Sequence, residues 1–220
     1  MIPECRGDGS SACVEVRERA ILAAASAIKA GDLVVFPTDT VYGIGADPFN
    51  PAAVQRLLDA KGRGRGQPSP VLAASSAQAF ALARTVPEGA MQLAKAYWPG
   101  ALTLILRVNP ELNLDLGDKP ETIALRVPAL PFALRLLAAT GPLAVSSANL
   151  NGQPAATTSA AAAKMLGDTV AIYLDGGATP STPSTIVDFA TTPKGRVIRT
   201  GAIGLASLRA LWPDLEGSDA

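Results

Sequence analysis

Short apolar and polar blocks alternate along this chain, and their spacing predicts both strands and helices. Apolar residues recur at helical spacing in 16–30, 52–60, 77–84, 88–97, 131–139, 159–166 and 205–212. Apolar runs of strand length lie at 33–36, 71–74, 102–108, 122–127, 143–145 and 171–174, and a pair of short strands is expected at 183–189 and 196–201. Several connections are too short for a crossover helix. The pattern therefore predicts an α/β fold with a single-domain, twisted, open mixed sheet and flanking helices.

Turn and capping residues indicate where these elements begin and end. Asn50 followed by Pro51 is a typical start for the helix at 52–60, and Gly31 is a typical stop for the first helix. Pro37 ends the first strand because proline has no N–H to donate to a neighbouring strand. We expect the domain to span 14–212, between a flexible N-terminal leader at 1–13 and a flexible tail at 213–220.

The composition of the chain excludes several classes of function and of catalytic or metal site. Hydrophobic residues make up 48% of the chain, while 19 basic residues balance 19 acidic ones, so no global charge favours nucleic acid or membrane. The absence of histidine excludes a Ser-His-Asp triad, an imidazole base and histidine metal ligands. Cys5 and Cys13 match no metal or redox spacing. No run approaches the ~20 apolar residues of a membrane helix, and no signal core is present, so we expect a cytoplasmic protein.

Two apolar strands run directly into polar segments. The strand at 33–36 is followed by Pro-Thr-Asp-Thr-Val-Tyr-Gly at 37–43, and the strand at 143–145 by Ser-Ser-Ala-Asn at 146–149. In open α/β sheets ligands collect at such strand ends, so two ends that point the same way define one crevice. Ordinary turns and helix caps use the same residues, and the pattern alone leaves both interpretations open.

A basic, glycine-rich segment follows the second predicted helix. Lys61, Arg63 and Arg65 alternate with glycines, and this composition fits either a solvated loop or a loop that folds around an anion. The segment lacks the Gly-Lys-Ser/Thr ending of a P-loop. Arg126 stands at the end of another apolar strand, where arginine serves either in a surface ion pair or as a ligand clamp.

Taken in order, these motifs resemble the YrdC/YciO family over about residues 14–212. The matching segments are Pro-Thr-Asp-Thr-Val-Tyr-Gly at 37–43, Lys-Gly-Arg at 61–63 with Pro68, Trp-Pro-Gly at 98–100, Leu-Arg-Val-Pro at 125–128, Ser-Ser-Ala-Asn at 146–149, Pro-Ser-Thr-Ile-Val-Asp at 183–188 and Arg-Thr-Gly at 199–201. The resemblance implies a twisted α/β fold around a basic cavity. It also implies an enzyme that joins L-threonine, bicarbonate and ATP into L-threonylcarbamoyladenylate and releases pyrophosphate. A transferase complex would take this product for the t6A modification of tRNA, and direct tRNA contact is possible.

The resemblance also assigns site residues. The threonine pocket comprises Thr40, Arg126, Ser184 and the backbone of Val145. The nucleotide contacts are Arg63, Gln67, Thr122, Ser147, Asn149 and Arg199, with Lys61 and Asn149 close to the phosphates and Lys61 and Arg63 as the catalytic pair. We expect Mg2+ as the cofactor, held mainly by phosphates rather than by protein side chains.

Residue chemistry fits this reaction. Each reacting species is anionic, so cations and backbone donors that hold anions together serve the chemistry without a histidine base. We therefore expect Lys61→Ala and Arg63→Ala each to lose much of the activity while remaining folded.

Two positions depart from the family pattern. Gly64 and Arg65 stand where many members carry proline directly after Lys-x-Arg, and Leu72 stands where many carry a threonine-contacting histidine. Three alternatives stay open: a tRNA or double-stranded RNA binding module of the same fold, a YciO-like member with little synthase activity, and carbamoyl transfer in hydrogenase maturation. The last normally has this module fused to acylphosphatase and zinc-finger segments.

Overall fold

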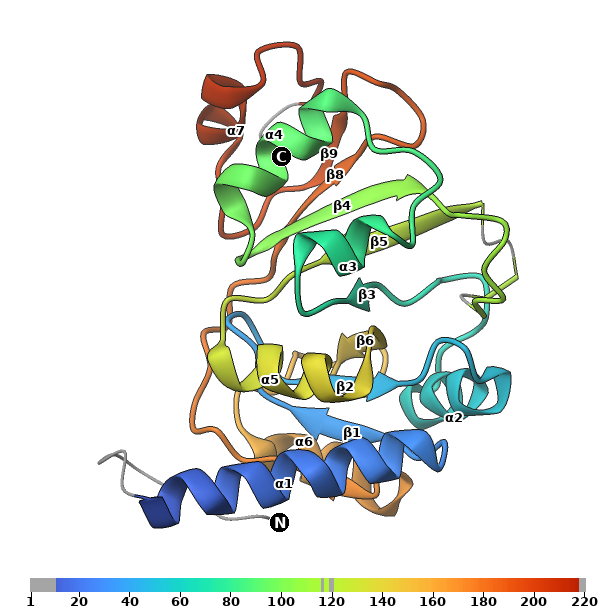
Figure 1. Cartoon of the computed structure of the whole chain (residues 1–220), viewed down its shortest axis with the longest axis vertical. Helices are drawn as coiled ribbons and strands as arrows, with labels where there is room; N and C mark the ends of the chain where they lie inside the picture. Colours follow the sequence, from blue (N-terminus) through green and yellow to red (C-terminus); the bar gives the residue numbers. More distant parts are fainter. Residues whose placement is uncertain (1–10, 116, 119–120, 218–220) are drawn as a thin grey trace.

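The computed structural model describes residues 11–115, 117–118 and 121–217 (Figure 1). Its helices are α1 (Ser11–Lys29), α2 (Pro51–Lys61), α3 (Ser76–Phe80), α4 (Glu88–Tyr97), α5 (Pro131–Thr140), α6 (Ser159–Leu166) and α7 (Leu205–Leu211), with a 3-10 turn η1 (Gly167–Thr169). Its strands are β1 (Val34–Phe36), β2 (Gly43–Ala46), β3 (Val71–Leu72), β4 (Leu102–Arg107), β5 (Thr122–Arg126), β6 (Leu143–Ser147), β7 (Ile172–Tyr173), β8 (Thr185–Asp188) and β9 (Arg196–Arg199). None of the helices in this part of the chain combines the length and apolar character needed to cross a bilayer.

The described strands form one mixed sheet in the order β7-β1-β2-β6-β3-β5-β4-β8-β9. The pairs β1/β7, β3/β5 and β4/β8 are parallel, and the remaining neighbours are antiparallel. The predicted mixed α/β sheet with flanking helices is thereby confirmed. Both β1 and β6 run antiparallel to β2, so these two strands point the same way, as a common crevice at their ends requires.

Helices cover both faces of the sheet in the half that contains β1, β2 and β6. Successive residues of β1 face opposite sides, as the pleat requires. Val34 and Phe36 pack in a cluster with α1 and α5, whereas Leu33 and Val35 pack in a second cluster with α2 and α6. Figure 1 shows this half of the molecule at the bottom of the view.

The other half, with β4, β5, β8 and β9, has helices over one face only. Leu104, Leu125 and Val187 belong to a third cluster with α3, α4 and α7. The alternate residues of the same strands, among them Thr103, Ala124 and Ile186, line a cavity instead. Strand β3 joins the halves, because Val71 packs in the third cluster and Leu72 in the cluster of α1 and α5.

Strand β2 is the principal element that the sequence pattern does not predict, because Gly-Ile-Gly-Ala has low strand propensity. The glycines permit close packing instead. A Cβ added at Gly43 would lie 2.6 Å from Val145 Cγ1, and one at Gly45 would lie 3.0 Å from Phe36 Cε1. Packing against residues of neighbouring strands therefore determines that this segment is a strand.

Both chain ends also differ from the expected boundaries. Helix α1 begins at Ser11, inside the expected 1–13 leader, and residues 1–10 lie outside the described residues. At the other end Leu215 is buried and Glu216 N donates to Gly195 O at 2.9 Å. Residues 213–217 therefore pack on the domain, and 218–220 lie outside the described part.

Candidate functional site

A cavity of about 560 Å³ lies between the two halves of the sheet. Its walls come from the segment after β1, the end of β6, the uncovered face of β4, β5 and β8, and Arg199 of β9. Most of the predicted site residues line it together: Thr40, Arg63, Thr122, Arg126, Val145, Ser147, Asn149, Ser184 and Arg199. Among the described residues, Lys61 and Gln67 lie outside this lining. The two polar strand ends therefore do share one crevice.

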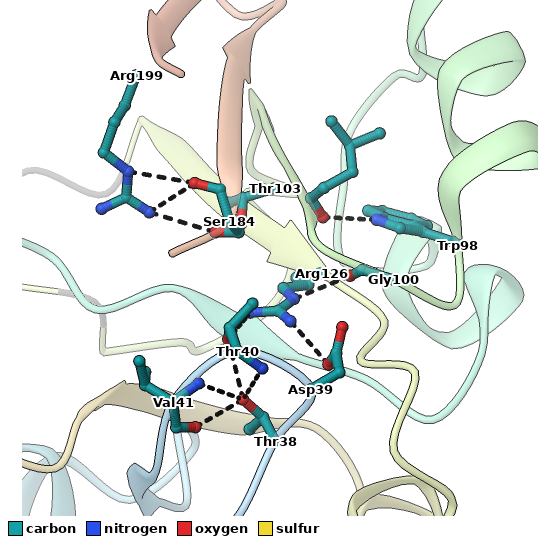
Figure 2. Close-up of polar contacts among 11 residues, drawn as sticks. Thr38, Asp39, Thr40, Val41, Trp98, Gly100, Thr103, Arg126, Ser184 and Arg199 are labelled. Carbon is teal, nitrogen blue, oxygen red and sulfur yellow. Dashed lines mark hydrogen bonds and ion pairs between the residues drawn. The ribbon is translucent and has the colours of Figure 1, made fainter. Parts of the chain in front are cut away.

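Arg126 is held at the cavity by three hydrogen bonds (Figure 2). Its Nη1 donates to Thr40 Oγ1 at 2.8 Å, its Nη2 to Asp39 Oδ1 at 2.7 Å, and its Nε to the carbonyl of Gly100 at 2.9 Å. Burial lowers the pKa of Arg126, and the negative charge of Asp39 opposes this shift. Because arginine stays protonated in proteins, the result is a fixed, buried cation at the cavity wall.

The segment after β1 is organised by Thr38. Its Oγ1 donates to the carbonyl of Val41 at 2.7 Å and accepts from Thr40 N at 3.2 Å and Val41 N at 3.3 Å. It also lies 3.0 Å from Thr40 Oγ1. These contacts form a compact turn that fixes the hydroxyl of Thr40 beside Arg126, as Figure 2 shows.

A second guanidinium, that of Arg199 on β9, lies at the upper left of Figure 2. Arg199 Nε and Nη2 donate to the carbonyl of Ser184 at 3.2 and 2.8 Å, and Ser184 Oγ lies 2.9 Å from Thr103 Oγ1. Burial lowers the pKa of Arg199, and the positive charge of Arg126 lowers it further. Two cations that repel each other across a cavity favour a bound anion between them.

Lys61 is buried, and its ammonium group is bound by the end of β6. Its Nζ donates to the backbone carbonyls of Ser147 and Asn149, the latter at 2.6 Å. Both residues line the cavity and are predicted nucleotide contacts, and the position of the Lys61 ammonium group close to the phosphates stays a prediction. Burial, with a smaller effect of the Arg63 charge, lowers the pKa of Lys61 to about 8. In this structure Lys61 shapes the end of β6.

The basic loop after α2 separates its two arginines. Arg63 lines the cavity, where its Nη1 lies 3.3 Å from Ser146 Oγ. Arg65 instead binds Asp115 at 2.7 Å and Asp118 at 3.1 Å, and its Nη1 donates to Gln55. Arg65 thereby ties the glycine-rich loop to the turn that precedes β5. Gln67, predicted as a nucleotide contact, is exposed.

The end of β6 presents an amide with a defined orientation. Asn149 Nδ2 donates to the carbonyls of Leu150 and Gln153, both at 2.8 Å. These bonds use the donors of the amide and leave Oδ1 as its acceptor. That oxygen is buried and has no hydrogen-bond partner within the described ranges. It is therefore an acceptor available to a ligand.

The residue assignments made from the sequence did not include Asp39, Gly100 or Thr103, although Asp39 lies in the polar segment at 37–43 and Gly100 in the Trp-Pro-Gly segment. Asp39 and Gly100 act through Arg126, and Thr103 through Ser184. One signal could have found Thr103: it alternates with Leu102 and Leu104 on β4, as Thr122 and Ala124 alternate with Ile123 and Leu125 on β5, so these three residues share the cavity face. Asp39 and Gly100 lie in segments that the sequence did mark, but only tertiary contact brings them to Arg126.

Comparison with known proteins assigns the chain to a family. Residues 26–201 match the model of the Sua5/YciO/YrdC family, which carries the description "Telomere recombination". The chain belongs to the Sua5/YciO/YrdC family. A Mycobacterium leprae protein named "Putative threonylcarbamoyl-AMP synthase" is 49% identical over 193 residues, which cover 87% of each chain. The "Threonylcarbamoyl-AMP synthase" of Pyrococcus abyssi is 37% identical over 89% of this chain and 59% of the relative.

Solved structures of this family share the fold. The crystal structure of P. abyssi Sua5 complexed with L-threonine superposes with a TM-score of 0.82 at 34% identity, over 92% of this chain. This chain spans 59% of the length of that protein. Escherichia coli YciO superposes with a TM-score of 0.78 at 26% identity, over 87% of this chain and 93% of YciO.

Proposed function

We propose that this enzyme is an L-threonylcarbamoyladenylate synthase, a nucleotidyltransferase that uses L-threonine, bicarbonate and ATP. The observation that carries the proposal is the cavity that brings together the buried guanidinium of Arg126 and the more exposed guanidiniums of Arg199 and Arg63. Relatives named as synthases over most of the chain, and a related structure described with L-threonine, support the same activity.

L-Threonine is placed at the Arg126 end of the cavity. The guanidinium fork suits the carboxylate of an amino acid, and the hydroxyls of Thr40 and Ser184 suit its polar side chain and ammonium group. The backbone of Val145 lines the same wall. In the family many members carry histidine at the position of Leu72, and here an apolar side chain forms that part of the wall.

ATP is placed along Arg63, Thr122, Ser147, Asn149 and Arg199. The threonine nitrogen attacks the carbon of bicarbonate-derived CO2 and loses a proton, which gives a carbamate. A carbamate oxygen then attacks the α-phosphorus, and the bond from that phosphorus to the bridging oxygen of pyrophosphate breaks. Charge grows on the phosphoryl oxygens in this step, and Arg63 and Arg199 offset it. Lys61 contributes by holding the carbonyls of Ser147 and Asn149 in place.

Mg2+ is the proposed cofactor, bound mainly through the phosphates of ATP. The described residues contain no cluster of three or more Cys, Asp or Glu that could hold a metal by itself. The buried oxygen of Asn149, which lacks a protein partner in the described ranges, is of the hard type that Mg2+ accepts, directly or through water. When bound, the ion offsets phosphate charge and orients the polyphosphate.

The product would serve as an activated donor for the t6A modification of tRNA, after transfer to the transferase that consumes it. An RNA-binding module without adenylation is the contrasting function. The balance of 19 basic and 19 acidic residues does not favour strong sequence-independent RNA binding. Filter binding to tRNA at rising salt measures that property directly.

One incubation tests the proposal. The purified chain is mixed with ATP, Mg2+ and bicarbonate and with each amino acid in turn, and the products are detected by mass spectrometry and by pyrophosphate release. We expect threonylcarbamoyl-AMP and pyrophosphate with L-threonine alone. Pyrophosphate release that is the same with every amino acid would exclude the synthase activity. The absence of product with every amino acid would exclude it as well.

A further inference from the structure

Ser69 carries a buried hydroxyl in the cavity wall that the proposed reaction does not use. The residue lines the cavity and is 6% exposed. Its Oγ has no hydrogen-bond partner in the part of the chain that the structure describes. Buried hydroxyls in proteins are nearly always hydrogen-bonded, so an unpaired one that lines a cavity indicates a ligand.

The backbone holds Ser69 rigidly. The residue lies between Pro68 and Pro70, both of which also line the cavity. Proline fixes its own φ angle and restricts the residue before it to an extended conformation. The hydroxyl of Ser69 is therefore presented from a pre-organised segment, which lowers the entropy cost of contacting a ligand.

The pairing of β3 with β6, extended beyond the strand ends, sets Ser69 opposite Ser146. Val145 N donates to the carbonyl of Pro70 at 2.7 Å, which extends the antiparallel register by one pair beyond Val71 and Ala144. The next position along sets Ser69 opposite Ser146. Opposed residues of antiparallel strands point to the same face, with Cβ atoms about 4.5–5.5 Å apart.

Ser146 in turn lies next to Arg63. Its Oγ is 3.3 Å from Arg63 Nη1, and Arg63 Nε is a second buried group with no partner among the described residues. A hydroxyl and a guanidinium N–H that both await an acceptor form a donor pair suited to an oxyanion. We propose that the Ser69 hydroxyl donates a hydrogen bond to a phosphate oxygen of the nucleotide, next to Arg63. This inference rests on the proposed function for the identity of the nucleotide.

Binding measurements on Ser69→Ala test the inference. Isothermal titration calorimetry with inorganic pyrophosphate, a non-hydrolysable ATP analogue and L-threonine separates the two ends of the cavity. We expect about tenfold weaker binding of pyrophosphate and of the analogue, the effect of one hydrogen bond to a charged group, and unchanged binding of L-threonine. The melting temperature should stay the same or rise, since the variant removes an unpaired buried hydroxyl. Ser159→Ala, a buried serine at the start of α6 away from the cavity lining, is the matched control.

The outcomes separate this inference from the proposed function. Wild-type affinity of Ser69→Ala for pyrophosphate would overturn the role of Ser69 while leaving the synthase proposal in place. A loss confined to L-threonine would also overturn it, because the hydroxyl would then serve the amino acid. A wild-type protein that binds neither nucleotide nor pyrophosphate would overturn both.

Discussion

Arg126 and Thr40, 86 positions apart in the sequence, are joined by a 2.8 Å hydrogen bond from Nη1 to Oγ1. The bond links strand β5 of one half of the sheet to the segment after β1 in the other half. The guanidinium of Arg126 also contacts Asp39 and Gly100, so its position depends on three separate segments of the chain.

Replacing Arg126 with lysine tests this arrangement. Lysine keeps the positive charge but lacks the planar fork, so at least one of the three contacts is lost and bidentate carboxylate binding ends. We expect the dissociation constant for L-threonine to rise at least about tenfold and the melting temperature to fall. Calorimetry and thermal denaturation measure both. Arg107→Lys on the neighbouring strand, where the side chain is exposed, is the control and should bind threonine normally.

Lys61 should make stability depend on pH in a defined window. The folded protein releases the Lys61 proton near pH 8, whereas the unfolded chain holds it to about the ordinary pKa of 10.5. The unfolded state therefore binds more protons between these values, and the free energy of unfolding rises with pH there. Relative to Lys61→Met, wild type should gain up to about 3 kcal/mol across the window.

Urea denaturation of both proteins at a series of pH values measures that difference. A difference that stays constant from pH 8 to 10.5 would show that Lys61 is not held in a proton-disfavouring site. The same experiment addresses the expectation that Lys61→Ala stays folded. Two buried carbonyls lose their donor in any such variant, so we expect a stability loss at neutral pH as well.

The contacts of Arg65 predict an effect on the nucleotide with little effect on stability. Arg65→Ala frees the glycine-rich loop that carries Arg63, so the Michaelis constant for ATP should rise severalfold, while that for threonine changes little. The ion pairs of Arg65 are partly exposed at the Arg65 side chain, so they contribute little to folding and the melting temperature should fall only slightly. If Arg65 acts through Asp115, the double variant with Asp115→Ala should be no worse than Arg65→Ala alone. Arg19→Ala, which breaks an exposed pair with Glu15 on α1, is the control.

Two glycines should respond oppositely to alanine. A Cβ at Gly43 would lie 2.6 Å from Val145 Cγ1, and valine on a strand cannot easily turn away. Gly43→Ala should cost about 1–3 kcal/mol of unfolding free energy and weaken threonine binding. At Gly64 a Cβ meets nothing within 4 Å, so Gly64→Ala should be neutral or stabilise by up to about 1 kcal/mol. Equal effects of the two substitutions on urea denaturation would contradict this packing argument.

The sequence predicted those parts of the fold that local chemistry determines. Asn50 caps α2 through bonds from the N–H groups of Ala52 and Ala53, and Pro51 begins the helix, as the motif indicated. Helix α4 has the expected bounds. Strand β2 escaped because its pairing with β1 and β6 and its tight packing are long-range features.

The site shows the same division. Arg126 and Ser147 were found because they stand at strand ends or in motifs that the sequence displays. The protein partners of Lys61 were not predicted, since a lysine beside a glycine-rich loop gives no sign that its ammonium group binds two carbonyls 86 and 88 positions away. The contacts of Arg65 depend on Asp115 and Asp118 in a remote turn, and no local pattern identifies them.

The cavity separates two halves that each have their own apolar packing, and this has a consequence for thermal behaviour. A substrate held between Arg126 and the residues of β6 would act as a bridge across the seam, contributing contacts that the empty protein lacks. Ligands that touch both walls should therefore raise the unfolding temperature in proportion to the logarithm of their concentration over the dissociation constant. L-Threonine and ATP together should raise the unfolding temperature by more than the sum of their separate effects, because each ligand completes the cavity wall that the other ligand contacts.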